Sequence, residues 1–158
     1  MKEPVSLRPV EADDLPILFA HQLDPEACRL AAFPSRDRDA FMAHWTTNIL
    51  GNPVAVSRAI LLGDRVTGNI GAWTDAGSHQ RFLSYWVGRE FWGRGIASAA
   101  LLQFLRFEST RPLHAQVIMH NLGSIRVLKK AGFTRVGEEA FPLPDGAPVK
   151  ELTYFLSA

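Results

Sequence analysis

One segment in the middle of the chain constrains the fold more than any other. The run Arg81–Val87 predicts a strand, and the glycine-bearing loop Gly88–Gly95 follows it directly. The loop leads into a helix that we expect from about Gly93 to Glu108. A strand that turns through glycines into a helix is a building unit of α/β sheets, so the chain is predicted to fold around such a sheet.

The same loop predicts a binding site for phosphate. The first amides of a helix have no partner within the helix, and together with the helix dipole they attract anions. Gly93 and Gly95 carry no side chain, so a phosphate can approach their backbone closely. Arg94 adds a positive charge beside them. The expected ligand is therefore a phosphate or a diphosphate.

Two well-known phosphate-binding motifs fit this segment poorly. Gly88 and Gly93 have the spacing of a Walker A loop, but Arg94 and Gly95 replace its lysine and its hydroxyl residue. A magnesium-dependent ATPase or nucleotide switch is therefore disfavoured. The dinucleotide fingerprint fits little better, because Ser98 stands at its last small position and no acidic residue follows a second strand. A structural turn without any ligand stays open as the other interpretation of the isolated motif.

Patterns on either side of this segment give the element order β-α-α-β-β-β-α-β-α-β-β. Strands are expected near residues 5–10, 54–62, 66–73, 81–87, 114–120, 133–136 and 149–156, and helices near 11–23, 35–50, 93–108 and 121–131. A Pro-rich loop, Phe141–Pro148, separates the last two strands. The fold class is α/β (α+β), with a mixed, mostly antiparallel central sheet of about seven strands flanked by about four helices.

Composition and charge exclude several classes of protein. The 158 residues suit one domain, 1–158, and the net charge of +1 gives no sign of a nucleic-acid partner. Cys28 is the only cysteine, which excludes an internal disulfide framework and a cysteine-rich zinc site. The first residues lack a signal-peptide pattern, and no apolar run approaches the ~18 residues of a membrane span. We expect a cytoplasmic protein that has no membrane partner and no metal.

Two blocks of sequence resemble the GNAT superfamily of N-acetyltransferases. The first is EFWGRGIA at residues 90–97, which fills the family's phosphate-loop frame [QR]-x-x-G-x-[GA], except that Glu90 stands first and Arg89 precedes it. Tyr85-Trp86 and the run WGRG at 92–95 are similar to the branch that acetylates N-termini of ribosomal proteins. The second block, residues 120–133, resembles N-x-x-S-x-R-V-L-x-K-x-G-F, although a well-capped helix alone explains most of it.

The resemblance implies a fold of the GNAT type and acetyl-coenzyme A as the co-substrate. In this family the strand at 81–87 would diverge from the strand at 114–120, and free backbone groups there would bind the pantetheine arm. A backbone amide near Val87 would polarise the thioester carbonyl. The cofactor-binding residues that the resemblance implies are Trp86, Val87, Arg89, Trp92, Gly93, Arg94, Gly95, Ile96, Ala97, Asn121 and Ser124.

The sequence offers few candidates for proton transfer. Many family members have a tyrosine acid where this chain has Leu128, which leaves Ser124 as the candidate proton donor to the departing thiolate. Phe82 stands where the related branch often has a glutamate. His120 has a suitable ordinary pKa of ~6.5 for a base, although a lone histidine is more often a surface or core-edge residue. Glu138 and Glu139 could orient a cationic amine, or could simply be solvated.

The sequence therefore predicts an N-acetyltransferase that moves an acetyl group from acetyl-CoA to a primary amine by direct attack in a ternary complex. The acceptor would be a protein N-terminus or a small amine, contacted by the first two helices and the loop Phe141–Pro148. A non-catalytic acyl-CoA-binding module or sensor is the alternative, because the usual tyrosine and glutamate are absent. A homodimer through the final hairpin stays open.

Overall fold

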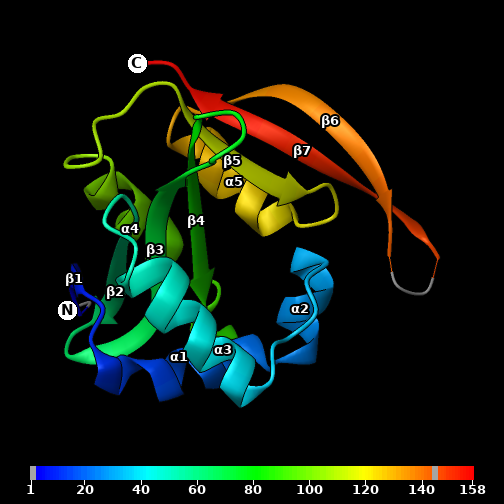
Figure 1. Ribbon diagram of the computed structural model, residues 1–158. Helices are drawn as coiled ribbons and strands as arrows, with labels where there is room; N and C mark the ends of the chain where they lie inside the picture. Colours follow the sequence, from blue (N-terminus) through cyan, green and yellow to red (C-terminus); the bar gives the residue numbers. More distant parts are fainter. Residues whose placement is uncertain (1–2, 144–145) are drawn as a thin grey trace.

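The computed structural model describes residues 3–143 and 146–158, and these form one sheet of seven strands in the order β1-β2-β3-β4-β5-β7-β6 (Figure 1). All neighbouring strands are antiparallel except β4 and β5, which are parallel. This confirms the predicted mixed, mostly antiparallel sheet. The strands are β1 (Val5–Pro9), β2 (Val56–Leu62), β3 (Arg65–Thr74), β4 (Arg81–Val87), β5 (Leu113–Ile118), β6 (Thr134–Pro142) and β7 (Pro148–Leu156).

Helices cover both faces of the sheet. Figure 1 shows α1, α2 and α3 on one face, with α4 and α5 on the other. The α-helices are α1 (Leu15–Gln22), α2 (Pro25–Ala31), α3 (Arg38–His44), α4 (Ile96–Phe104) and α5 (Leu122–Lys130). Shorter turns are η1 (Ala12–Asp14), the π-helical η2 (Trp45–Leu50) that continues α3, and η3 (Arg89–Phe91). Within the described residues, no helix combines the length and the apolar character needed to cross a bilayer.

Three details differ from the sequence-based expectation. The short helix α2 was not predicted, although the Asp24 side chain caps it by accepting from the Ala27 amide at 2.9 Å and Pro25 is its first residue. Its seven residues are too few to show a hydrophobic period. Strand β6 continues to Pro142, so the expected loop Phe141–Pro148 is shorter, and its residues 144–145 lie outside the described part.

The predicted helix at 93–108 is also shorter, because α4 begins only at Ile96 and ends at Phe104. The reason lies in the backbone of two glycines. Gly93 and Gly95 have φ values of +78° and +74°, in the left-handed region that a right-handed helix cannot contain. Both glycines therefore belong to the loop before the helix, and they set the direction in which α4 leaves the sheet.

The apolar core has two parts, one on each side of the sheet. The larger part fills the space between the sheet and helices α4 and α5, and it includes Ile60, Ile70, Leu83, Leu101, Phe104, Leu113 and Leu128. The smaller part lies under α1 and α3 and includes Leu15, Leu18, Phe41, Trp45 and Ala59. These two cores fix α4 and α5 against one face and α1 and α3 against the other.

A partly buried ion pair holds the start of α1 against β1. Arg8 donates to both carboxylate oxygens of Asp14, at 2.7 and 2.9 Å, and the backbone amide of Glu11 donates to the same carboxylate at 2.8 Å. These hydrogen bonds hold the pKa of Asp14 below its ordinary value, against the opposing effect of burial. The side chain of Asp14 is only 4% exposed, so its charge depends on these partners.

We expect Asp14→Asn to lower the free energy of unfolding by about 2 kcal/mol at pH 7, since it removes one partner of a largely buried pair. Asp14 has a lower pKa in the folded state, so its contribution is present above the ordinary value of ~3.9 and is lost as pH falls through the lowered value. Urea unfolding at pH 7 and again at a pH well below ~3.9 measures both effects. The exposed neighbour variant Asp13→Asn should stay within about 0.5 kcal/mol of the wild type, and an equal loss there would contradict the assignment.

Candidate functional site

Strands β4 and β5 diverge, and this divergence opens the sheet. They pair only over Arg81↔Leu113, Phe82↔His114 and Leu83↔Ala115. Beyond that point β4 continues along β3 as far as Val87, while β5 continues along β7 as far as Ile118. The last four residues of β4 therefore have no strand beside them on the β5 side, which is the divergence that the family resemblance implied.

Backbone groups of β4 face this gap. The amide of Gly88 donates to the Thr67 carbonyl of β3 at 2.8 Å. Because successive residues of a strand direct their peptide groups to opposite sides, the peptide groups of Val87 and Tyr85 point away from β3 and into the gap. The indole Nε1 of Trp92 donates to the Val87 carbonyl at 2.8 Å. The Val87 amide points to the same side of the strand, toward the mouth of the gap.

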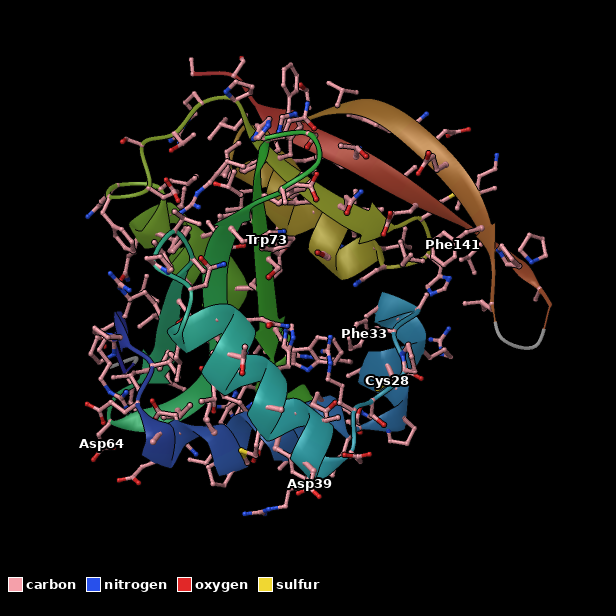
Figure 2. The ribbon with its side chains drawn as sticks, in the orientation of Figure 1. Cys28, Phe33, Asp39, Asp64, Trp73 and Phe141 are labelled. Carbon is pink, nitrogen blue, oxygen red and sulfur yellow. The ribbon has the colours of Figure 1, made fainter. Side chains whose placement is uncertain are left out.

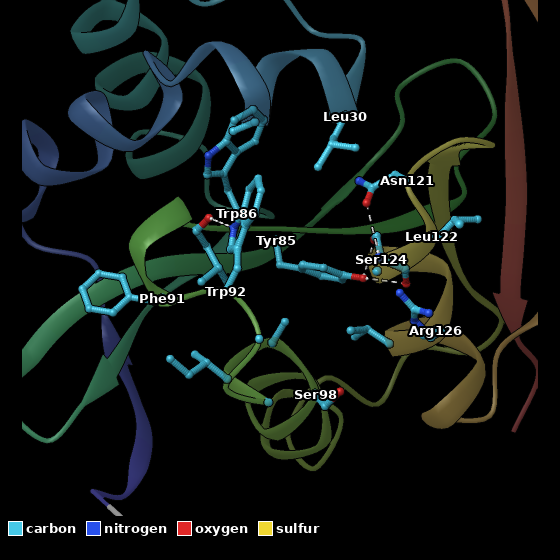
Figure 3. Close-up of a pocket in the computed structure, with 18 of the residues that line it drawn as sticks. Leu30, Tyr85, Trp86, Phe91, Trp92, Ser98, Asn121, Leu122, Ser124 and Arg126 are labelled. Carbon is cyan, nitrogen blue, oxygen red and sulfur yellow. Dashed lines mark hydrogen bonds between the residues drawn. The ribbon is translucent and has the colours of Figure 1, made fainter.

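A pocket of about 630 Å³ occupies the gap and extends to the helices around it (Figure 3). Its walls come from α2, from the end of β4, from the glycine loop with the first turn of α4, and from α5 with the residues before it. The predicted cofactor-binding residues that line it are Trp86, Val87, Trp92, Gly93, Gly95, Ile96, Ala97, Asn121 and Ser124, and the candidate base His120 lines it too.

The first turn of α4 presents free amides to this pocket. The first hydrogen bond of the helix runs from the Ala99 amide to the Gly95 carbonyl at 3.1 Å. The amides of Ile96, Ala97 and Ser98 lie before that bond, so they have no acceptor within the helix. Together with the positive end of the helix dipole they make an anion site. All three residues line the pocket.

The loop before α4 packs closely against α1. A Cβ on Gly88 would lie 2.7 Å from the Cδ2 and Nε2 atoms of the His21 ring, so only glycine allows the loop to pass this close to α1. The His21 ring in turn packs edge-on against Phe91, with 6.3 Å between the ring centroids. Burial lowers the pKa of His21, which favours the neutral imidazole in this contact.

The basic side chains that line the pocket are not the arginines that the sequence predicted. Arg89 forms an ion pair with Asp24 at 3.3 Å, and the Arg94 guanidinium lies 5.9 Å from the centroid of the Phe91 ring. Neither arginine lines the pocket, so their contact with the cofactor stays a prediction. Arg126 and Lys130 of α5 do line it. Their spacing of four residues puts them on one helix face, a signal that was present in the sequence.

Two hydroxyl groups meet on the wall of the pocket. Figure 3 shows Tyr85 pointing from β4 toward Ser124 of α5, and their oxygens are 2.7 Å apart. Burial raises the pKa of the Tyr85 phenol to about 12, an effect that the hydrogen bond to Ser124 partly offsets. Leu128, at the position of the usual tyrosine acid, is 1% exposed and belongs to the core. A tyrosine hydroxyl is thus present, but it comes from β4.

The alternation of side chains along β4 indicates the direction in which Tyr85 points. Side chains alternate along a strand, so Tyr85 must share a face with Leu83. Leu83 is part of the core that α4 and α5 cover. A hydroxyl at Tyr85 therefore had to point toward those helices.

His120 lies at the edge of the pocket with one ring nitrogen already engaged. Its Nε2 is 2.8 Å from the backbone carbonyl of Arg29 in α2. A carbonyl only accepts, so in this contact Nε2 carries the proton and Nδ1 is left as the basic nitrogen. The imidazole thus links the turn before α5 to α2, and its predicted role as a base depends on Nδ1.

The aromatic residues near the site divide into two groups. Trp45 and Phe91 are each only 6% exposed and belong to the core, and Phe91 also lines the pocket. Trp86 and Trp92 line the pocket. Phe33, which follows α2 (Figure 2), packs edge-on against Trp86 with ring centroids 6.3 Å apart. This contact joins the pocket to the face that the first three helices cover.

A second, smaller cavity of about 120 Å³ continues the opening between β4 and β5. Tyr85 and Ser124 line both cavities. The smaller one also reaches Ser84, Gln116 and Glu151, which come from β4, β5 and β7. Of the acids considered from sequence, Glu138 forms ion pairs with Arg135 and Lys150, both at 3.6 Å, and lines neither cavity. Over residues 3–143 and 146–158, no group of three or more His, Cys, Asp or Glu side chains is placed to hold a metal ion.

Comparison with known proteins supports the arrangement. Residues 5–134 match the family model of the acetyltransferase (GNAT) domain. A spermidine N-acetyltransferase from Vibrio cholerae, solved in complex with CoA and spermine, is 11% identical, with a TM-score of 0.83 over 97% of this chain and 95% of its own. A protein provisionally named a phosphinothricin N-acetyltransferase is 21% identical, with a TM-score of 0.83 over 98% of each chain.

A third structure, provisionally named an acetyltransferase, is 31% identical, with a TM-score of 0.71 over 97% of this chain and 82% of its own. Among curated proteins, no sequence matches significantly.

Proposed function

The chain belongs to the acetyltransferase (GNAT) family, and we propose that its large pocket holds acetyl-CoA for direct attack by a primary amine. Enzymes of this family transfer an acetyl group from acetyl-CoA to an amine, so the non-catalytic binding module is not favoured. The observation that carries the proposal is that one pocket joins the free amides of α4 to the Tyr85–Ser124 hydroxyl pair.

The diphosphate of coenzyme A would bind at the start of α4. Ile96, Ala97 and Ser98 offer amides without a partner in the helix, and the positive φ of Gly93 and Gly95 turns the loop so that no side chain covers them. Arg126 and Lys130 supply positive charge from the facing wall. Charge-assisted hydrogen bonds of this kind are about twice as strong as neutral ones.

The pantetheine arm would lie along the free edge of β4. The Tyr85 and Val87 peptide groups face the gap and can bond an extended chain as a neighbouring strand would. The Val87 amide would then donate to the thioester carbonyl and stabilise the negative charge that develops there on attack. Asn121, whose side chain caps α5 by accepting from the Ser124 amide at 3.3 Å, would contact the arm from the other wall.

The Tyr85–Ser124 pair would receive the departing sulfur. A phenol with a pKa of about 12 stays protonated at neutral pH and can donate a hydrogen bond. A free thiol has a pKa of only ~8.5, so full transfer of the phenol proton to the thiolate is uphill. The pair would therefore stabilise the thiolate by hydrogen bonding and relay to it the proton that the new amide nitrogen gives up.

The acceptor would be a primary amine, either a protein N-terminus or a small molecule. Tyr85-Trp86 and the WGRG run at 92–95 favour the branch that acetylates N-termini of ribosomal proteins. The acceptor would enter from the face covered by α1 to α3, where the Phe33–Trp86 contact borders the pocket. An α-amino group has an ordinary pKa of ~8, so a fraction of it is neutral at physiological pH.

A panel of amines tests this proposal. Purified protein should release thiol from acetyl-CoA in the presence of at least one class among N-terminal peptides, small primary amines and amino-acid derivatives, and mass spectrometry should show a gain of one acetyl group on the amine. Calorimetric titration should show CoA binding in the absence of acceptor. Binding of CoA without turnover on any amine would favour the non-catalytic module, and absence of binding would contradict the cofactor site.

A further inference from the structure

The smaller cavity brings a carboxylate to the opposite side of the gap from the hydroxyl pair. Leu152 and Tyr154 of β7 belong to the core under α4 and α5. Because side chains alternate along a strand, the adjacent Glu151 points to the opposite face, which α2 covers. Tyr85 lies on the α4 and α5 face. Glu151 and Tyr85 nevertheless line the same 120 Å³ cavity, because the sheet is open between β4 and β5.

Glu151 is the only carboxylate among the described residues that line either cavity. It is half-buried, and its neighbour across the strands, Glu139, carries the same charge. Among the described residues, neither acid forms an ion pair. Burial raises the pKa of the Glu151 carboxyl above its ordinary value, and Glu139 raises it further. A half-buried carboxylate without a cation is well suited to receive one from a ligand.

Resting on the function proposed above, we propose that Glu151 binds the ammonium group of the acceptor and removes its proton, and that the enzyme therefore selects amines without an adjacent carboxylate. The lining of the smaller cavity includes no Lys, Arg or His among the described residues, so nothing there would neutralise an acceptor carboxylate. A carboxylate one carbon from the ammonium would be placed near Glu151 and repelled by it. Amides, peptides and simple amines carry no such charge.

Groups on the two faces of the sheet would then act in different steps of the reaction. The acceptor ammonium gives a proton to Glu151, and the neutral amine attacks the thioester carbonyl from the α2 side. The C–N bond forms, the C–S bond breaks and its electron pair leaves on sulfur. The new amide nitrogen loses a second proton, which reaches the thiolate through the Tyr85–Ser124 hydroxyls. Glu151 returns its proton to water, so one proton is released in each turnover.

Matched acceptors test the selectivity. Free amino acids are compared with the corresponding amino-acid amides, and kcat/KM is expressed per concentration of neutral amine, because the adjacent carboxylate also raises the pKa of the amine. The wild-type enzyme should acetylate the amide of at least one pair with kcat/KM at least about tenfold above that of the acid. Equal or higher kcat/KM for the free acid in each active pair would overturn the inferred selectivity while leaving the acetyltransferase function intact. No turnover on any member of the panel would overturn the proposed function and this inference with it.

Variants of the carboxylate test the assignment to Glu151. Glu151→Gln keeps the size of the side chain and should lower kcat/KM for the amide about 100-fold, the lower end of the range for loss of a general base, and should reduce the preference for amide over acid to below about threefold. Glu151→Asp should recover part of the rate. Glu138→Gln removes the same charge from the same hairpin, away from both cavities, and should leave both values unchanged. A Glu151→Gln enzyme with wild-type rate and selectivity would exclude Glu151 from the reaction.

Discussion

Gly95→Val is expected to weaken the binding of coenzyme A by about 100-fold. Gly95 has a φ of +74°, and a Cβ built on it meets no protein atom within 4 Å, so the valine side chain would project into the space before the helix. That space is where the diphosphate would approach the amides of Ile96 and Ala97. Loss of two charge-assisted hydrogen bonds at about 1.5 kcal/mol each gives about 3 kcal/mol, which corresponds to roughly 100-fold in Kd. Calorimetric titration with CoA measures the change.

The chain offers a matched control for the backbone strain in that variant. Gly146 also has a positive φ, +88°, and a Cβ on it likewise meets nothing within 4 Å. Gly146→Val therefore carries a similar cost of about 1–2 kcal/mol for a left-handed non-glycine residue, in the β6–β7 hairpin. Its CoA affinity should equal that of the wild type. The phosphate site would be misassigned if Gly95→Val bound CoA normally, or if both variants lost affinity equally.

Tyr85→Phe is expected to lower kcat about 100-fold with little change in CoA affinity. The ring keeps its packing, but the hydroxyl that lies 2.7 Å from the Ser124 oxygen is lost. The departing thiolate then loses the stabilisation that a positioned donor gives, for which a factor of about 100 is the lower end of the usual range. Steady-state rates with the best amine of the panel, together with CoA titration, separate the effect on chemistry from the effect on binding.

Substitution of Ser124, the other member of the hydroxyl pair, provides a second experiment. Ser124→Ala should also lower turnover more than affinity, and the double variant should be no slower than the slower single variant, because the two hydroxyls act as a unit. Fully additive losses would show that the two groups act separately. Wild-type turnover in Tyr85→Phe would remove the phenol from the mechanism and leave Ser124 as the only donor of the pair.

Local chemistry made part of this molecule predictable from sequence. The strand Arg81–Val87 has the same bounds in the structure as in the prediction, since alternating bulky residues specify a strand over a few positions. The glycine loop was also recognised, although the helix after it begins at Ile96 and not at Gly93. The helix expected from residue 121 begins at Leu122 with Asn121 as its cap, because a cap acts within one turn of helix. The helix α2 was missed although its cap was visible, because a helix this short has too few turns for a hydrophobic stripe.

Contacts between segments far apart in the chain could not be predicted from local sequence patterns. Tyr85 and Ser124 are 39 residues apart, and only the packing of α5 over the divergent end of β4 brings their oxygens together. Glu151 comes from β7, which the sheet order inserts between β5 and β6. The tertiary structure also pairs Arg89 with Asp24 of the turn before α2, and it places Arg126 and Lys130 of α5 on the pocket wall.

By itself, the sequence determined that the chain turns through glycines between β4 and α4, because backbone conformation depends on neighbouring residues. The diphosphate site at this turn stays a prediction. Only the tertiary structure decided which side chains surround the reacting centre. Strand pairing stops after Leu83 and Ala115, and the opening that results admits groups from both faces of the sheet. Pairing register and its interruption arise from contacts between segments far apart in the chain, which no local pattern records.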